Sequence, residues 1–461
     1  MRNGTPGLVG PLLEVLRNRR SRRFGLGMKM PAGPLAYESA HAPVPLCEEE
    51  EALLAFAACG ITGYALGDLC FAPGQGATIL ARLLGRTIPS GDAIQTVSLV
   101  ITNDTGTYLM KRPQDFPGEA IPELARLAEA GEYVELYRRS RIKIKDTRSA
   151  PSLEPLVNLN VNRWSLYRPG CTYFLPVNEF TFMYINGLLD ILNETTGAMI
   201  VDERAGFQPA GVKRFARSKG GHLDDNPKND RIITLQMVEN LVTEFVTIEQ
   251  GMMLQNLALM AEALGLGGFP HWAAHPYAWF EALGCRMASM PSTKYLGMNP
   301  VLGKIAGWLG RDPAVPYVHG LDAPPASQTA EDRSATGCPP LLIPFCPPYY
   351  PSMEAAVRAV VDLKFGPNGT YRGGASNSAL KDSASLAKSA DAPSEATIQA
   401  TIACCNYVYS RYGRFPGYSP PLRTVLGFQV NHVDLDFYDK YYRPEAVSDS
   451  VRKHFACWHG G

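Results

Sequence analysis

The pattern of apolar and polar positions predicts one long buried helix, followed by a cluster of glycines. Residues 249–269, EQGMMLQNLALMAEALGLGGF, are apolar on nearly all sides of a helical projection, and a preceding apolar run over 231–248 can extend the same helix. The helix nevertheless carries Gln255, Asn256 and Glu262. A buried polar group without a partner costs about 1–3 kcal/mol, so the pattern predicts that these side chains face partners or a ligand.

The remaining elements mix helical and strand-like periodicities. Helical spacing predicts helices over 9–20, from the acidic run 48–51 to Gly60, and over 119–137, 180–193, 352–364 and 394–411. Two β-rich runs around Asn103, Asp104 and Gly106 predict a hairpin, and further strands are indicated at 171–177 and 339–346. Together the segments favour an α+β fold.

Residues 366–395 are rich in Gly, Ser and Ala and contain few large apolar side chains. Such a composition buries too little surface to offset chain entropy, so we expect a flexible loop, either a lid or a surface linker. A segment rich in proline and aromatic residues, 412–461, forms the C-terminal tail.

Composition narrows the function classes. The 461 residues are 46 % apolar, and 44 basic residues balance 44 acidic ones. No overall charge favours nucleic acid or an anionic membrane, and no apolar run is long enough for a membrane-spanning helix. The ten cysteines lack the spacing of a disulfide scaffold or a CxxC pair. We therefore expect a cytoplasmic protein with reduced thiols.

A basic cluster follows the first predicted helix. The stretch NRRSRRF, Asn18 to Phe24, places four arginines and one serine within six residues. Guanidinium forks and a hydroxyl are groups that bind phosphate. A solvated basic helix end, stabilised by the helix dipole, is the alternative interpretation.

The glycine cluster after the long helix is a second candidate. Gly265, Gly267 and Gly268 would let the backbone approach a flat ligand, with N–H groups facing a ring nitrogen. A helix C-cap followed by a tight turn would also explain these glycines.

In this order, the two motifs resemble the FMN-dependent nitroreductase superfamily. The N-terminal cluster is similar to the arginine–serine motif that binds the flavin phosphate and ring edge, and the central helix is similar to QNL…A..LGLG, which leads to a backbone N–H at flavin N5. The resemblance implies cofactor contacts at Arg19, Arg20, Ser21, Arg23, Gln255, Asn256, Gly265, Leu266, Gly267 and Gly268. A late arginine, Arg414 or Arg423, would complete the phosphate site, and Asn178 is a weak substitute for the family's ring-contacting asparagine segment, which is absent.

The resemblance also implies a fold and a function. We expect one nitroreductase-like domain over 1–461, with a mixed or antiparallel central sheet, flanking helices and an enlarged region at about 70–250. FMN would pass hydride or electrons between NAD(P)H or an organic substrate and an acceptor, in a homodimer that binds no nucleic acid and no membrane. The resemblance does not identify the substrate.

Two other functions stay open. The chain could bind flavin without turnover, or it could be a metal-dependent enzyme centred on His432, Asp434 and Asp436, whose alternation would place them on one face of a strand. A strand followed by a helical turn with an aspartate cap explains the last pattern without a metal. Serine-hydrolase, Walker-type and Rossmann fingerprints are absent from the sequence.

Overall fold

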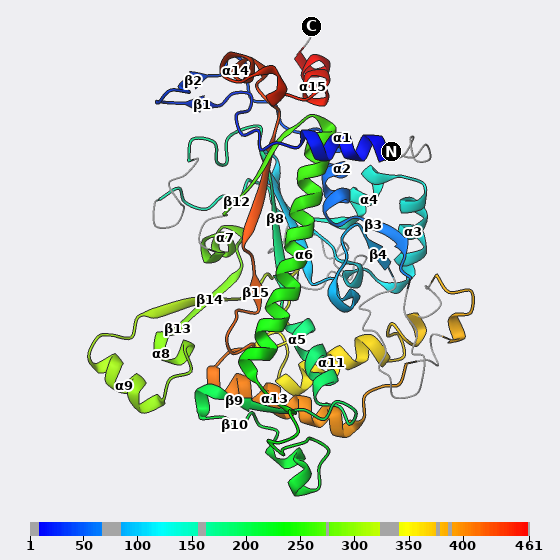
Figure 1. Ribbon diagram of the computed structural model, residues 1–461, viewed down its shortest axis with the longest axis vertical. Helices are drawn as coiled ribbons and strands as arrows, with labels where there is room; N and C mark the ends of the chain where they lie inside the picture. The colour runs from blue at the N-terminus through cyan, green and yellow to red at the C-terminus, as the bar shows by residue number, and fades with distance from the viewer. Residues whose placement is uncertain are drawn as a thin grey trace.

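The computed structural model describes residues 9–66, 84–154, 163–272, 276–322, 341–374, 379–385 and 390–459. The molecule is elongated, and the long helix α6 runs through its middle (Figure 1). The helices are α1 Val9–Asn18, α2 Glu48–Cys59, α3 Ile121–Glu129, α4 Tyr133–Ser140, α5 Thr181–Ile191, α6 Leu235–Leu264, α7 Pro276–Leu283, α8 Ser292–Tyr295, α9 Pro300–Trp308, α11 Met353–Phe365, α13 Glu395–Tyr412, α14 Leu435–Tyr441 and α15 Asp449–His459. The strands are β1 Lys29–Met30, β2 Tyr37–Glu38, β3 Ile61–Tyr64, β4 Leu84–Arg86, β5 Val97–Asn103, β6 Gly106–Met110, β7 Arg141–Lys145, β8 Thr172–Glu179, β9 Met199–Asp202, β10 Gln208–Pro209, β11 Ile232–Thr234, β12 Gly267–Trp272, β13 Arg286–Pro291, β14 Ala314–Gly320, β15 Leu422–Arg423 and β16 Leu426–Asn431.

A seven-stranded sheet forms the centre of the fold, with the order β12-β16-β8-β5-β6-β7 and with β15 paired to β8. All of its neighbouring strands are antiparallel. Strand β12, which follows α6 directly, is an edge strand of this sheet, and β16 from the C-terminal tail lies beside it. The protein therefore combines helices with an antiparallel sheet, which confirms the α+β prediction.

Each face of the sheet packs against its own hydrophobic layer. Side chains such as Leu99 and Phe174 face α2 and the C-terminal half of α6. Val100 and Tyr173, on the opposite face, pack against Trp279 of α7. Alternation along the strands thus buries both faces of the sheet.

A helical layer encloses the N-terminal half of α6. Helices α5, α11 and α13 pack there around a second apolar core that includes Tyr184, Val242 and Val408. Figure 1 shows these helices at the end of the molecule opposite α1, α14 and α15. The two halves of α6 therefore belong to different cores.

Most of the predicted elements are present. The run 231–248 belongs to a continuous 30-residue α6 after a short strand, as its apolar pattern indicated. The hairpin forms between β5 and β6, where Asn103 pairs with Gly106 and its side-chain oxygen accepts two turn N–H bonds. The helix predicted over 119–137 is instead two helices, α3 and α4, because Gly131 adopts a left-handed φ of 72°.

Some expectations were wrong or fall partly outside the described residues. Of the expected strand 339–346, residues 341–346 are described, and they form only an isolated bridge between Leu321 and Leu342, because Pro344 cannot supply a ladder N–H group. Residues 375–378 and 386–389 of the expected loop lie outside the described residues, whereas Thr370, Tyr371 and Ala390 of the same segment are buried. The part of the expected enlarged region at 70–83 also lies outside them.

The thiols and helices agree with two simple expectations from composition. Cysteines in the described chain are free, and most of them are buried. None of the described helices has both the length and the apolar character that a membrane crossing requires.

The buried carboxylate of Glu239 anchors a loop to α6. It accepts N–H bonds from Gly417, Tyr418 and Ser419 at 2.7, 2.8 and 3.0 Å. Burial raises the pKa of Glu239 to about 7, although these N–H groups and the Arg414 charge oppose the shift. The loop after α13 is therefore held by a group that titrates near neutral pH.

This titration predicts a pH-dependent stability. A carboxyl whose folded pKa is raised makes a contribution that is complete below its unfolded pKa, near 4.5, and is lost as pH rises through about 7. Between pH 4.5 and about 7, the free energy of unfolding of the parent should fall by up to about 3 kcal/mol. Glu239→Gln cannot titrate, so this variant should not show the fall. Urea titrations at several pH values measure it. Glu244→Gln, at an exposed position of the same helix, should keep the parental slope; equal slopes in the parent and Glu239→Gln would contradict the assignment.

Candidate functional site

The structure brings the two sequence motifs together at one end of the molecule. Helix α6 ends at Gly265, which has a left-handed φ of 75°, and the chain continues as β12. The segment after α1 lies against this exit, since the Arg22 carbonyl is close to Gly267 and the Arg23 guanidinium lies 5.2 Å from the centre of the Phe269 ring. Arginine cluster and glycine exit, more than 240 residues apart, are spatial neighbours.

A buried ion pair holds the two motifs together. Arg22 Nη1 donates to Glu262 Oε2 at 2.5 Å, and both side chains are only 2 % exposed. Ser448 donates to the other Glu262 oxygen at 2.5 Å, while Arg22 Nε donates to the Ala446 carbonyl at 3.0 Å. Both charges are thus paired and hydrogen-bonded, which a buried ion pair requires.

The other arginines of the cluster remain accessible. Arg20 and Arg23 are exposed, as is Ser21, while Arg19 is half-buried. Arg20 Nη1 donates to the carbonyls of Arg17 and Arg19, both at 2.9 Å. Within the described part of the chain, no carboxylate forms a salt bridge with Arg19, Arg20 or Arg23. The surface beside the glycine exit therefore carries positive charge that no carboxylate of the described residues neutralises.

The glycines at the exit pack against the chain itself. A Cβ at Gly265 would lie 2.3 Å from the Ser450 carbonyl oxygen, and one at Gly268 would lie 2.6 Å from the Phe428 ring. At Gly267 the Arg22 carbonyl oxygen would be 2.7 Å away. These close approaches require glycine without any ligand, so the spacing alone does not define a cofactor site.

The backbone of β12 still offers donors. Its residues pair with β16 on one side only, with Gly267 opposite Asn431 and Gly268 opposite Val430. Alternate N–H groups of an edge strand point away from the sheet. The sheet thus leaves alternate N–H groups of β12 unpaired on its outer side, while Gly267 and Gly268 themselves are buried.

The polar side chains of the central helix have separate partners. Asn256 Nδ2 donates to the carbonyls of Ala57 and Thr87 at 3.0 and 3.3 Å, whereas Gln255 is exposed. Leu266 is buried in the core under the sheet. The partners of Asn256 and Glu262 are thus groups of the chain itself.

The other predicted cofactor residues lie far along α6. Asn178 Nδ2 donates to the Val246 carbonyl at 3.0 Å, and the Arg423 carbonyl accepts from Gln250 Nε2 at 3.2 Å. At 1.5 Å per residue, Val246 and Gln250 lie roughly 27 and 21 Å before Leu264. Within one chain the structure therefore does not bring Asn178 or Arg423 to the arginine cluster.

Arg414 is also remote from the cluster. It is buried, lies 3.5 Å over the Tyr295 ring and donates to the Tyr295 carbonyl at 2.9 Å. It follows α13, which Figure 1 shows at the opposite end of the molecule from α1. These contacts account for Arg414 as an anchor of the α8 segment.

The proposed metal triad divides between two side-chain clusters. His432 lies with Glu50 and His454, whereas Asp434 and Asp436 lie with His41. Strand β16 ends at Asn431, and Asp434 caps α14 by accepting the Phe437 N–H at 3.0 Å. The three residues thus do not share one face of a strand, and the interpretation as a strand followed by a helical turn with an aspartate cap is confirmed.

Glu50 and His432 of the first cluster are buried, and the Glu50 carboxyl is ionised. Burial raises the pKa of Glu50, but the imidazoles of His432 and His454 and the Cys47 N–H outweigh it and hold that pKa well below its ordinary value. The Cys47 N–H donates to Glu50 Oε2 at 2.9 Å, and His454 Nε2 lies 2.7 Å from Oε1.

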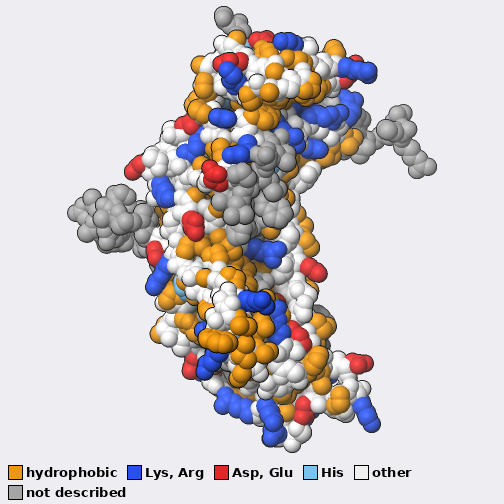
Figure 2. Space-filling model, turned by 90° about the vertical axis from the view of Figure 1, so that its left-hand side faces the viewer, with side chains coloured by type: hydrophobic (Ala, Val, Ile, Leu, Met, Phe, Trp, Pro, Cys, Tyr) orange, Lys and Arg blue, Asp and Glu red, His pale blue; other side chains and the backbone are white. Residues whose placement is uncertain are grey.

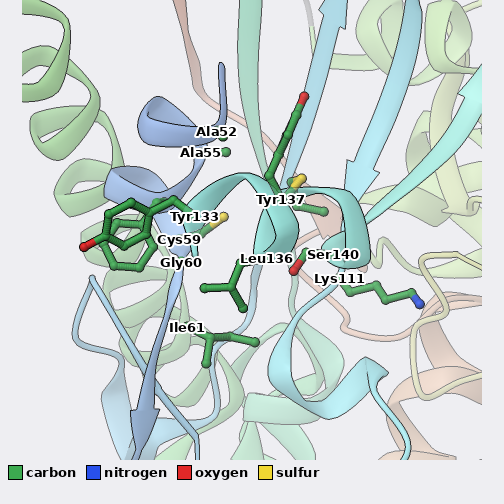
Figure 3. A pocket seen from close by; sticks show the side chains of 12 residues that line it. Ala52, Ala55, Cys59, Gly60, Ile61, Lys111, Tyr133, Leu136, Tyr137 and Ser140 are labelled. Carbon is green, nitrogen blue, oxygen red and sulfur yellow. The ribbon is translucent and has the colours of Figure 1, made fainter. Parts of the chain in front are cut away.

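Two of the cavities lined by described residues lie elsewhere. A small one of about 20 Å³ between α2 and α4 is lined by Cys59, Leu136 and Tyr137 (Figure 3) and has room for about one water molecule. A larger cavity of about 440 Å³ lies between the α8–α9 segment and Arg411, with Lys294, Lys304 and Asp312 in its wall. No predicted site residue lines either cavity.

Comparisons with known proteins give little further guidance. No protein-family model matches the chain, and no curated protein matches it. Among solved structures it is similar to a candidate nitroreductase from Ralstonia eutropha JMP134, with 14 % identity over 62 % of this chain and 79 % of that chain and a TM-score of 0.29. Similarity at this level carries no argument about the activity of this chain.

Two features were not found from the sequence. Arg22, the one arginine of the cluster without an expected role, is the structural member. Side chains alternate between exposed and buried along 21–24, a property of the fold that the sequence does not carry. Glu50 and His454 join His432 only through folding, since 382 and 22 residues of sequence separate them from it.

The Arg22–Glu262 pair predicts a large loss of stability when one partner is removed. Arg22→Ala leaves a buried carboxylate without its counter-charge, and we expect the free energy of unfolding to fall by about 3–5 kcal/mol. Chemical denaturation measures this change. Arg20→Ala, which removes an exposed guanidinium from the same cluster, should change stability by less than about 0.5 kcal/mol; similar losses in the two variants would contradict the structural role of Arg22.

Proposed function

We propose that the protein is an FMN-dependent oxidoreductase of the nitroreductase type. The observation that carries this proposal is the meeting of the NRRSRRF segment with the exit of α6, linked by the Arg22–Glu262 pair. Bound FMN would transfer hydride or electrons at N5 between NAD(P)H or an organic substrate and an acceptor. The chain would supply binding and orientation.

The accessible cations fit a phosphate. Arg19, Arg20 and Arg23, together with the Ser21 hydroxyl, offer several charge-assisted donors within five residues, and no described carboxylate competes for them. Because guanidinium groups bind phosphate oxygens in a fork, the cluster can both neutralise and orient the anion.

The edge of β12 would supply the backbone contact to the flavin ring. An outward N–H of Gly267 or Gly268 would donate to the ring nitrogen, while the glycines themselves keep the strand close to Arg22 and Phe428. The roles assigned to Gln255 and Leu266 would then be indirect, since one is exposed and the other is buried in the core. Asn256, bonded to Ala57 and Thr87, and Gly265, which ends α6, would position this edge.

Loss of FMN affinity in an arginine–serine variant is the direct test. Arg19→Ala with Ser21→Ala removes donors worth about 1.5–3 kcal/mol for each bond to a charged group, so the FMN dissociation constant should rise at least about tenfold. Quenching of flavin fluorescence measures it. Arg126→Ala, at an exposed arginine of α3, is the matched control; unchanged affinity in the double variant would sink the assignment.

Anaerobic reduction separates an enzyme from a flavin-binding protein. Loss of the visible flavin absorption on adding NADH or NADPH, followed by its return with an acceptor, indicates turnover. A flavin that stays oxidised with both donors and with organic reductants would favour the non-catalytic alternative.

We further infer that the protein is a homodimer. One face of α6 exposes Met237, Leu241, Phe245 and Ile248 at helical spacing, with exposures of 58, 49, 40 and 52 %. A repeated apolar stripe on a long helix is a self-complementary surface, which a two-fold contact can bury. Of the three remote residues, only the half-buried Arg423 could reach the phosphate site of a second copy, because Asn178 and Arg414 are buried.

Another apolar surface serves as the control for this dimer. Figure 2 shows hydrophobic side chains gathered in the lower part of the molecule, on the face that carries the β13–β14 arm. Helix α9 of this arm exposes Val301, Leu302, Ile305, Trp308 and Leu309. We expect Leu241→Glu to shift the protein from dimer to monomer in light scattering after gel filtration, because it places a charge inside the stripe. Ile305→Glu should leave the dimer intact. A monomeric parent, or a dimer retained by Leu241→Glu and lost in Ile305→Glu, would exclude this interface.

A further inference from the structure

Three elements distant in sequence bring metal-ligating atoms together near the end of the molecule that carries α15 (Figure 1). Glu50 lies in the first turn of α2, His432 directly follows β16, and His454 lies on α15. One ligand atom from each lies within 4.8 Å of the others. Glu50 and His432 are buried, and the His454 side chain is 12 % exposed.

The spacing of these atoms is that of ligands around one ion. In tetrahedral coordination with bonds of about 2.0–2.2 Å, neighbouring ligand atoms lie about 3.3–3.6 Å apart. Nε2 of His432 lies 3.6 Å from Glu50 Oε2, and Nε2 of His454 lies 2.7 Å from Oε1. With all three ligand atoms within 4.8 Å of one another, these separations are close to those around a single ion.

The two imidazoles converge on one carboxylate. His454 and the Cys47 N–H bond the two Glu50 oxygens. The His432 imidazole approaches the same carboxylate at 3.6 Å. Its ring centre lies 4.9 Å from that of His454, and Trp458 closes the outer side at 5.2 Å from His432.

We propose that Glu50, His432 and His454 bind a divalent transition metal ion, with Zn²⁺ as the ion that fits best. Two imidazoles and one carboxylate form a nitrogen and oxygen ligand set that suits Zn²⁺, and three protein ligands leave a fourth position open. The ion links α2, the end of β16 and α15. This inference is independent of the proposed FMN site, because none of the three ligands belongs to the arginine cluster or β12.

Zinc titration of the metal-depleted, full-length protein tests the proposal. We expect one Zn²⁺ per chain in calorimetry, and a melting temperature that rises with added Zn²⁺. Glu50→Gln keeps an acceptor for the Cys47 N–H but loses the charged ligand, and His454→Ala loses an imidazole. Because even changes to groups behind the ligands cost about 10–100-fold in affinity, each variant should lose at least about 100-fold.

The second cluster provides the matched control. His41→Ala removes an imidazole from the group with Asp434 and Asp436, so this variant should retain the parental stoichiometry and affinity. Circular dichroism checks that each variant is folded. If His454→Ala does not fold, Glu50→Gln alone decides the test. A parent that binds no Zn²⁺ at micromolar concentration, a folded Glu50→Gln that binds as tightly as the parent, or binding lost only in His41→Ala would overturn the site.

Discussion

The polar groups buried on α6 determine how the rest of the chain is arranged. A helix of 30 residues through the centre of a fold buries several carboxylates and amides, and each must be bonded or lose about 1–3 kcal/mol. Glu239 binds the loop 417–419, Glu249 binds Ser90, Thr96 and the Val97 N–H, and Glu262 binds Arg22 and Ser448. Each carboxylate therefore fixes a different part of the chain to the same helix.

This arrangement explains why two cores form one molecule. The N-terminal half of α6 packs with α5, α11 and α13, and the C-terminal half packs with α2 and the sheet. Between the halves, Gln250 donates to Asn178 on β8 and to the Arg423 carbonyl on β15. The sheet is thus bonded to α6 near the middle of the helix and cannot rotate about α6 without breaking these bonds.

The sequence predicts elements better than it predicts their arrangement. Periodicity identifies α6, the β5–β6 hairpin and α13 because the patterns of these segments are local. It misses the short strands β13 and β14, which mix proline, polar and apolar residues without alternation. The position of β16 between β12 and β8 depends on contacts between segments more than 150 residues apart, which no local pattern contains.

The same limit applies to the candidate site. The motifs NRRSRRF and LGLGG predict that two segments matter, and the structure places them side by side. The roles within each motif were not predictable, because Arg22 and the exposed Arg23 have the same side chain and differ only in which direction the chain turns it. Side chains after α1 are therefore alternately exposed and buried, as in an extended segment and not as in a continued helix.

Helix α15 connects the exit of α6 to the histidine cluster. The position of Gly265 is determined by the Ser450 carbonyl and by the Cβ of His454, which would lie 2.3 and 2.7 Å from an added side chain. His454 extends from that contact to Glu50 on α2, while Ser448 and Ser450 bond the side chain and carbonyl of Glu262. A shift of α15 would therefore disturb three things together: the turn into β12, the Arg22–Glu262 pair and the Glu50–His432–His454 cluster. The same short helix therefore holds both the Glu50–His432–His454 cluster and the glycine exit in place, since rigid packing transmits displacements between them.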